Sequence, residues 1–191
     1  MSNRIANYFL SEGFCRGDVV SVFMENRPEF VVVWLGLSKM GAIPALVNYN
    51  LKYDALAHSV KVVGSKALVF DTELARHVED IMDEVSGGEE GTIFPTYHLL
   101  SEEAVASSTA NIEGTKNLSR HLLDSSEAPV PAGLQRSIKF RDTLMYIFTS
   151  GTTGLPKAAV VKHSRYLLAG EASILMIGKG SRALLLTKSC H

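Results

Sequence analysis

Cysteine is scarce in this sequence, with Cys15 and Cys190 the two present among 191 residues. Two thiols so far apart in the chain form neither a disulfide framework nor a zinc site by themselves. An excess of charge of one sign is also lacking, because 19 Lys and Arg residues face 20 Asp and Glu residues, for a net charge of −1. This balance argues against a nucleic-acid partner held by a broad basic surface.

Long apolar stretches are missing as well. The longest run without a charged residue covers positions 143–156, which is 14 residues rich in Thr, Ser and Gly, whereas a membrane-spanning helix needs about 18 apolar residues or more. The first ten residues contain Arg4 and no apolar core of a secretory signal. The sequence therefore predicts neither a membrane-spanning helix nor a secretory signal. A membrane role would depend on a surface patch or on a segment outside these 191 residues.

What is present is an ordinary globular composition, 46% hydrophobic and 20% charged, which excludes wholesale disorder. Short β-branched runs alternate with helix-length segments. Because a parallel return needs a crossover of a dozen or more residues, we expect the first three strands to be mutually parallel. The fold class predicted is α/β, a mostly parallel sheet with flanking helices. The predicted strands of this first part are 18–24, 43–47 and 67–70, and the helices are 28–40, 53–63 and 71–85.

The middle and the end of the chain are less regular. Segment 101–137 is polar and is predicted to be an irregular connecting region, with a short helix at 115–124 and a loop at 125–136. Helix 28–40 is apolar around nearly its whole circumference, which predicts burial on both sides. Further strands are predicted at 92–98, 143–148, 158–161 and 183–187, and a further helix at 163–177.

The most informative stretch is the loop Thr149–Lys157, which lies between two predicted strands. Its two glycines allow a sharp turn and a close approach to a ligand. Successive free backbone N–H groups form an anion-binding concavity, and four hydroxyls within five residues add donors for phosphate oxygens. Lys157 supplies a positive charge. The combination favours a polyphosphate ligand over a neutral one.

Other interpretations of this region stay open. The loop is not a Walker A motif, because Pro156 and Ala158 stand at the wrong positions, and no G-x-G-x-x-G occurs. A polar hairpin between two strands would explain the same residues. His163 is either a group near the phosphates or a polar helix-start residue, and the turn 25–29 is interpreted as a structural cap. No metal site is predicted, because the remaining histidines lack the spacing of metal ligands: His58, His77, His98 and His121.

Segment 146–157 resembles the AMP-binding signature of the adenylate-forming superfamily. Segments 158–166, 22–30 and 34–42 are similar to the fatty acid transport proteins, the very-long-chain acyl-CoA synthetase branch. By this resemblance the chain is part of the large N-terminal domain of such an enzyme. The residues that the resemblance assigns to nucleotide binding are Tyr146, Ile147, Phe148, Thr149, Ser150, Gly151, Thr152, Thr153, Gly154, Leu155, Pro156 and Lys157.

The resemblance implies ATP-dependent activation of a long-chain or very-long-chain fatty acid. The carboxylate attacks the α-phosphate, and coenzyme A then takes the acyl group from the acyl-adenylate. The implied cofactors are ATP or AMP, Mg²⁺ and coenzyme A, with the loop around the β- and γ-phosphates and Lys157 stabilising phosphate charge. The resemblance also implies membrane association on the cytosolic face of the endoplasmic reticulum or plasma membrane, a cytoplasmic location if this chain stands alone, and a homo-oligomer.

The sequence also departs from the family. Segment 178–191 does not read like the family's next strand, and we interpret it as a divergent tail. We expect these 191 residues to lack the family's motifs for adenine and ribose, its fatty acid tunnel and its small C-terminal domain. We therefore expect residues 1–191 to form a partial AMP-binding domain without turnover of its own. The alternatives are a non-catalytic nucleotide-binding or partner-binding module, and an unrelated α/β nucleotide-binding protein.

Overall fold

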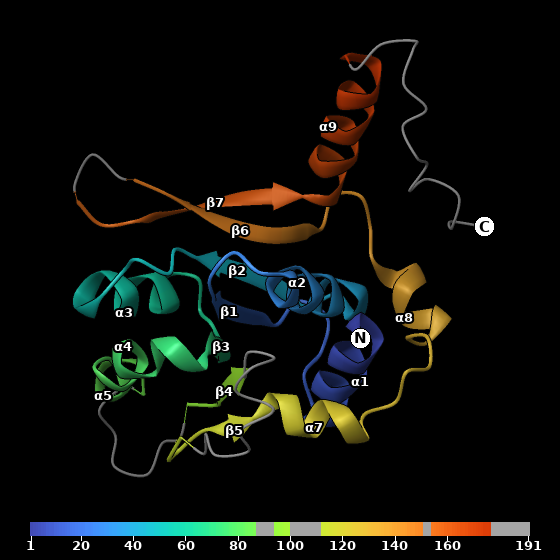
Figure 1. Cartoon of the computed structure of the whole chain (residues 1–191). Helices are drawn as coiled ribbons and strands as arrows, with labels where there is room; N and C mark the ends of the chain where they lie inside the picture. Colours follow the sequence, from blue (N-terminus) through green and yellow to red (C-terminus); the bar gives the residue numbers. More distant parts are fainter. Residues whose placement is uncertain (87–93, 100–111, 151–153, 177–191) are drawn as a thin grey trace.

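The described residues form one seven-stranded sheet in the order β5-β4-β3-β1-β2-β6-β7 (Figure 1). The structure is a computed structural model that describes residues 1–86, 94–99, 112–150 and 154–176, with the backbone only for 170–176. The strands are β1 (Val19–Phe23), β2 (Ile43–Val47), β3 (Ala67–Asp71), β4 (Thr96–Leu99), β5 (Lys116–Asn117), β6 (Thr143–Thr149) and β7 (Lys157–Lys162).

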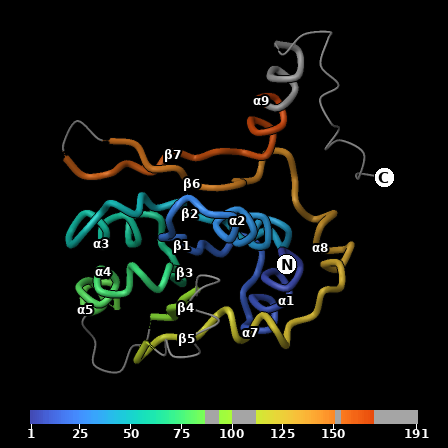
Figure 2. The backbone as a smooth tube through the Cα atoms, viewed as in Figure 1, coloured from blue at the N-terminus to red at the C-terminus, as the bar shows by residue number. Residues whose placement is uncertain are grey.

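Helices connect and cover these strands. The helices are α1 (Ser2–Ser11), α2 (Pro28–Met40), α3 (Tyr53–Val62), the 3₁₀ turn η1 (Thr72–Leu74), α4 (Ala75–Glu79), α5 (Met82–Val85), α7 (Leu118–Asp124), α8 (Ala132–Ser137) and α9 (His163–Met176). Helix α9 begins where β7 ends and projects away from the sheet (Figure 2).

The prediction of a mostly parallel sheet is confirmed. Strand β1 pairs in parallel with both β2 and β3, in the registers Val19↔Ile43 and Val20↔Ala67. Strands β3, β4 and β5 continue the parallel pairing on one side, and β6 pairs in parallel with β2 on the other. The exception is β7, which returns antiparallel to β6. A six-residue strand after a short loop can only return in this way.

Side chains of the central strands alternate between two hydrophobic cores, one on each face of the sheet. On one face, Val20 and Val22 of β1 pack with residues of α1, α2 and α7. On the other face, Phe23 and Phe70 pack with residues of α3, α4 and α5. Every residue of β1 and of β3 is buried. Burial on both faces explains why these strands read as continuous apolar runs.

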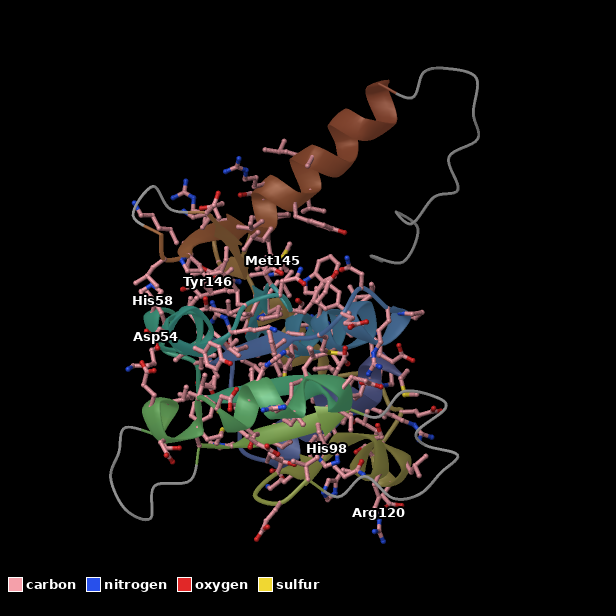
Figure 3. The ribbon with its side chains drawn as sticks, turned by 60° about the vertical axis from the view of Figure 1, so that its left-hand side comes forward. Asp54, His58, His98, Arg120, Met145 and Tyr146 are labelled. Atoms are coloured by element: carbon pink, nitrogen blue, oxygen red, sulfur yellow. The ribbon has the colours of Figure 1, made fainter. Side chains whose placement is uncertain are left out.

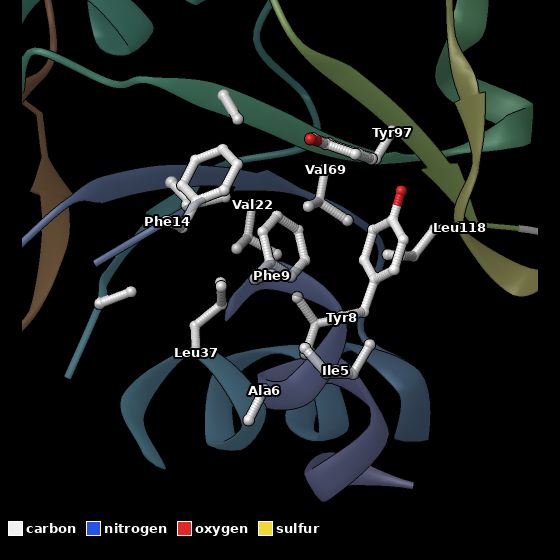
Figure 4. Close-up of a cluster of buried hydrophobic side chains, with 14 of the residues drawn as sticks. Ile5, Ala6, Tyr8, Phe9, Phe14, Val22, Leu37, Val69, Tyr97 and Leu118 are labelled. Atoms are coloured by element: carbon white, nitrogen blue, oxygen red, sulfur yellow. The ribbon is translucent and has the colours of Figure 1, made fainter. Parts of the chain in front are cut away.

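Helix α1 was not predicted from the sequence. It lies across α2, and its side chains Ile5, Tyr8 and Phe9 fill the first core (Figure 4). The crossing is close at Gly36, where an added Cβ would lie 2.5 Å from the Cβ of Ile5. A larger residue at position 36 would separate the two helices, so this glycine sets their distance.

Three predictions of secondary structure were wrong in detail. The single helix expected at 71–85 is divided into η1, α4 and α5, and Ile81, between α4 and α5, is buried. Helix α2 is not buried on both sides, since Val31 and Leu35 are exposed. The loop expected at 125–136 ends in α8. The predicted strand 183–187 and the tail 178–191 lie outside the described residues, as do parts of 92–98 and 101–137.

Candidate functional site

The loop that the sequence pattern indicates connects β6 to β7 at the edge of the sheet where the parallel strands have their carboxyl ends. Tyr146 and Phe148 belong to β6, and Thr149 is its last residue, paired with Lys157 at the start of β7. The polar hairpin considered as an alternative is therefore the observed geometry. It does not exclude a binding role, because ligands of open α/β sheets bind at this same edge.

The described part of the loop is open to solvent. Ser150, Gly154, Leu155 and Lys157 are exposed, and Pro156 is half-buried. Gly154 has φ +90°, a left-handed conformation that favours glycine. Within the described ranges, no carboxylate forms an ion pair with Lys157, so its ammonium is available to an anion. Three predicted binding residues lie outside the described residues: Gly151, Thr152 and Thr153.

A cavity of about 540 Å³ adjoins the hairpin. It lies between the end of α3 and the start of β7, two elements that contact each other. Figure 3 shows His58 on α3, below Tyr146 of β6. His58, which the sequence analysis did not link to the loop, is half-buried and lines the cavity. The residues that line the cavity are His58, Val62, Val63, Tyr146, Leu155, Pro156, Lys157 and Ala158.

The opposite end of the hairpin is held by Asp142. Its carboxylate accepts a hydrogen bond from the backbone N–H of Lys139 at 2.7 Å and forms an ion pair with Arg16 at 2.6 Å. Both contacts lower the pKa of Asp142, and the hydrogen bond from the backbone of Lys139 contributes most. They join the start of β6 to the turn before β1, so the hairpin is fixed at its base and exposed at its loop.

His163 lies at this base and not at the loop. It is the first residue of α9, and its backbone N–H donates to the carbonyl of Asp142. Strand β7 separates it from Lys157 by six residues, which is roughly 20 Å of extended chain. Burial lowers the pKa of His163. The geometry favours the helix-start interpretation over a contact with phosphates.

A second group of charged residues, which no sequence pattern linked, lies at the carboxyl ends of β1, β3 and β4. Asp71 is 1% exposed, and its carboxylate accepts a hydrogen bond from the backbone N–H of Glu25 at 2.7 Å. The guanidinium of Arg27 lies 2.5 Å from the same carboxylate. Arg27 and Thr72 both donate to the carbonyl of Leu99, at 3.4 and 3.0 Å. Three strand ends are thereby tied together.

Burial changes the acidity of this pair. It raises the pKa of Asp71 to about 6, because the low-dielectric surroundings outweigh the hydrogen bond from Glu25 and the charge of Arg27. Strand order changes direction between β1 and β3, where α/β sheets often have a crevice. In this chain the side chains of Arg27 and Asp71 occupy the position where such a crevice would lie. The turn 25–29 was predicted to be structural, and these contacts agree with that interpretation.

Relatives of this chain are fatty acid transport proteins and ligases. Long-chain fatty acid transport protein 1 of Bos taurus is 42% identical over 174 aligned residues, covering 86% of this chain and 24% of the bovine protein. Medium/long-chain-fatty-acid--CoA ligase FadD6 of Mycobacterium tuberculosis is 32% identical over 168 residues, covering 88% of this chain and 24% of the ligase. The chain thus spans about a quarter of the length of these relatives.

The fold has close counterparts among solved structures. The anthranilate CoA ligase AuaEII, in complex with anthranoyl-AMP, superposes with a TM-score of 0.73 at 20% identity, covering 89% of this chain and 30% of that chain. At such identity the likeness concerns the fold. In sequence, residues 1–187 match the AMP-binding enzyme family. With the glycine- and hydroxyl-rich sequence that follows β6, this match leads to one conclusion: the chain belongs to the AMP-binding enzymes.

Proposed function

We propose that the chain is part of an ATP-dependent ligase that activates long- or very-long-chain fatty acids to acyl-CoA through an acyl-adenylate, coupled to fatty acid uptake. The observation that carries the proposal is the loop Thr149–Lys157 at the carboxyl end of β6. The similarity to fatty acid transport protein 1 supports the substrate class.

In this proposal, residues 146–157 bind the nucleotide. Tyr146 to Phe148 fix the start of the loop in the sheet, and the hydroxyls and backbone N–H groups that follow donate to phosphate oxygens. Lys157 stabilises negative charge on the phosphates. Phosphoryl chemistry depends mainly on positioning and on charge stabilisation, so a loop with these groups needs no nucleophile of its own.

ATP would enter as its Mg²⁺ complex, and coenzyme A would be the acyl acceptor. Mg²⁺ at nucleotide sites is bound mainly by phosphate oxygens and water, with one or two protein oxygens. The exposed hydroxyls of Thr149 and Ser150 are consistent with that chemistry. Among the described residues, no group of three His, Cys, Asp or Glu side chains could hold a metal ion by itself.

We further propose association with the cytosolic face of the endoplasmic reticulum or plasma membrane, and self-assembly into a homo-oligomer. The similarity to fatty acid transport proteins supports this location. Among the described helices, none has the length and apolar character needed to cross a bilayer. In domain terms, we propose that 1–191 is a partial AMP-binding domain, with 101–137 as its connecting region and 178–191 as a divergent tail.

The test is ATP binding by calorimetry with a Lys157→Ala variant. We expect affinity to fall about tenfold or more, because a charged hydrogen bond contributes about 1.5–3 kcal/mol. Lys162→Ala is the matched control, since Lys162 is also exposed and lies at the other end of β7. Equal affinities for the wild type and Lys157→Ala would refute the role of the loop.

A second candidate function is a nucleotide-binding module without turnover, because the site found among the described residues is a loop suited to phosphates. Placement of reacting groups supplies on the order of 7–11 kcal/mol of a barrier, and the described residues offer the phosphate side of such a site. We expect the 191-residue chain to make no acyl-CoA from radiolabelled fatty acid, ATP and coenzyme A. Turnover within tenfold of a full-length relative would contradict this, and adenylate formation separates the two functions.

A further inference from the structure

A second cavity, of about 220 Å³, lies on the face of the sheet that α4 and α5 cover. Its walls come from β3, β4, the two helices and the residues that precede β5. In the sheet order, β3, β1 and β2 separate β4 from β6 (Figure 1). At the usual spacing of neighbouring strands, β4 and β6 are roughly 19 Å apart. The cavity is therefore distinct from the loop proposed to bind the nucleotide.

The deepest part of this cavity contains a hydroxyl without a partner. Thr96 in β4 is 2% exposed, and its Oγ1 has no hydrogen-bond partner among the described residues. Side chains alternate along a strand, and Tyr97 lies in the first core, so Thr96 is directed to the opposite face and lines the cavity. Buried hydroxyls are nearly always paired, because an unmade hydrogen bond costs free energy. An unpaired one that faces a cavity indicates a polar group on a ligand.

The side walls of the cavity are apolar. Phe70 and Val78 are buried, and Met82 and Ile112 pack partly buried against the same core. A phenyl ring and a thioether both make favourable contacts with an aromatic ring. The volume is below the roughly 300–1,000 Å³ of pockets for larger ligands and well above the space of one water molecule. The walls therefore fit a small molecule with a single ring.

The mouth of the cavity is acidic. Glu79 in α4 and Glu113 before β5 line it, and both are exposed. No Lys or Arg is among the lining residues, and within the described ranges neither carboxylate forms an ion pair. Two carboxylates at one mouth attract a cation. A primary ammonium has three donors, which is enough for both of them.

We propose that this cavity binds a small aromatic amine that carries a hydroxyl group on its ring. The ammonium pairs with Glu79 and Glu113 at the mouth, and the ring packs against Phe70 and Met82. The ring hydroxyl reaches Thr96, whose own hydroxyl both donates and accepts, so a phenol completes its hydrogen bonding. The inference goes beyond the proposed function, because this cavity shares no lining residue with the phosphate loop.

The probe is tyramine, titrated into the 191-residue chain and followed by NMR at the methyl groups of Thr96, Val78 and Ile112. We expect 2-phenylethylamine, which lacks the ring hydroxyl, to bind about two- to tenfold more weakly, the effect of one hydrogen bond. The uncharged alcohol 2-(4-hydroxyphenyl)ethanol is expected to bind about tenfold more weakly, because each exposed carboxylate contributes a factor of about two to five. The anion 3-(4-hydroxyphenyl)propanoate is expected to shift none of these resonances.

The variant Thr96→Val replaces the unpaired hydroxyl by a methyl group of similar size. We expect it to lose the preference for tyramine over 2-phenylethylamine. Glu113→Gln is expected to weaken both amines about two- to fivefold and to leave the alcohol unchanged. Asp80→Asn is the matched control, because Asp80 is an exposed carboxylate directly after Glu79 that does not line the cavity. Circular dichroism verifies that each variant is folded.

Three results would overturn the proposal. Tyramine might shift no methyl resonance of the cavity, or Thr96→Val might retain the wild-type preference for tyramine. Equal losses in Asp80→Asn and Glu113→Gln would mean attraction to an acidic surface alone. Lys157→Ala is expected to bind tyramine as the wild type does, so a failure of the phosphate role of the loop leaves this proposal standing.

Discussion

Strands β1 and β3 and the hairpin β6–β7 belong to one sheet, but their surroundings differ. All residues of β1 and β3 are buried, whereas in β6 only Leu144 and Met145 are buried and in β7 no residue is. The buried strands contribute the cores, and the exposed hairpin carries the glycine loop and Lys157. In this molecule the part that stabilises the fold and the part proposed to bind the nucleotide are therefore separate.

The prediction with the largest expected effect compares two phenylalanines, one buried and one exposed. Phe70 in β3 is fully buried, and Phe140 before β6 is 69% exposed. We expect Phe70→Ala to lower the free energy of unfolding by about 3–5 kcal/mol, and Phe140→Ala to change it by less than about 0.5 kcal/mol. Urea unfolding followed by circular dichroism measures both. Similar losses for the two variants would mean that the exposed segment leading into β6 stabilises the fold as much as the core of β3 does.

The next test uses the buried carboxylate. Because burial raises the pKa of Asp71 from 3.8 to about 6, the folded chain binds this proton more tightly than the unfolded chain does. The stability from this group is fully present below about pH 4 and is lost as the pH rises through about 6. Between pH 7 and pH 4 we expect the wild type to gain about 2–3 kcal/mol relative to Asp71→Asn.

Asp142, at the base of the hairpin, provides a control whose contribution to stability depends on pH in the opposite direction. The pKa of Asp142 is lowered, so its contribution to stability is present above its unfolded pKa and is lost as the pH falls through its folded pKa. Asp142→Asn should therefore converge with the wild type in strong acid, whereas Asp71→Asn diverges from it. If the difference between wild type and Asp71→Asn does not change with pH, the buried-carboxylate argument is wrong.

The smallest expected effect sharpens the same comparison. Lys157 is exposed and forms no ion pair within the described residues. Lys157→Ala should change the free energy of unfolding by less than about 0.5 kcal/mol, although we expect it to weaken ATP binding. Thermal unfolding without ligand measures this. A loss above about 1 kcal/mol would mean that Lys157 supports the hairpin itself, and its effect on ATP would then need another explanation.

The sequence predicted the central strands well because their signal is local. Runs such as 19–23 and 67–70 are buried on both faces, so they are apolar at nearly every position. Helix α1 was missed because it has no capping side chain and polar residues make up half of it. Its place is set by contacts such as Gly36 with Ile5, which pair positions far apart in the chain.

Part of the candidate site could also be predicted, because its signal is local in the sequence. Residues 149–157 are contiguous, and their composition indicates phosphate binding directly. The wall formed by His58 and Val62 comes from another helix, so no spacing within the loop predicts it. Likewise, Arg27 and Asp71 are 44 positions apart and meet only because β1 and β3 are neighbours. The one local signal for this pair was the carboxylate of Asp71, which directly follows an apolar run.

The pairing of β6 with β2 also has a consequence for how the chain acquires its structure. Leu46 and Ile147 are opposite each other in the sheet although they are 101 positions apart. Closing so long a loop costs chain entropy before other contacts compensate for it. Distant pairings of this kind therefore slow folding. During synthesis, β1, β2 and β3 are available to pair long before β6 leaves the ribosome. We therefore expect the hairpin, and with it the edge proposed to bind ligands, to be the last part of the sheet to assemble.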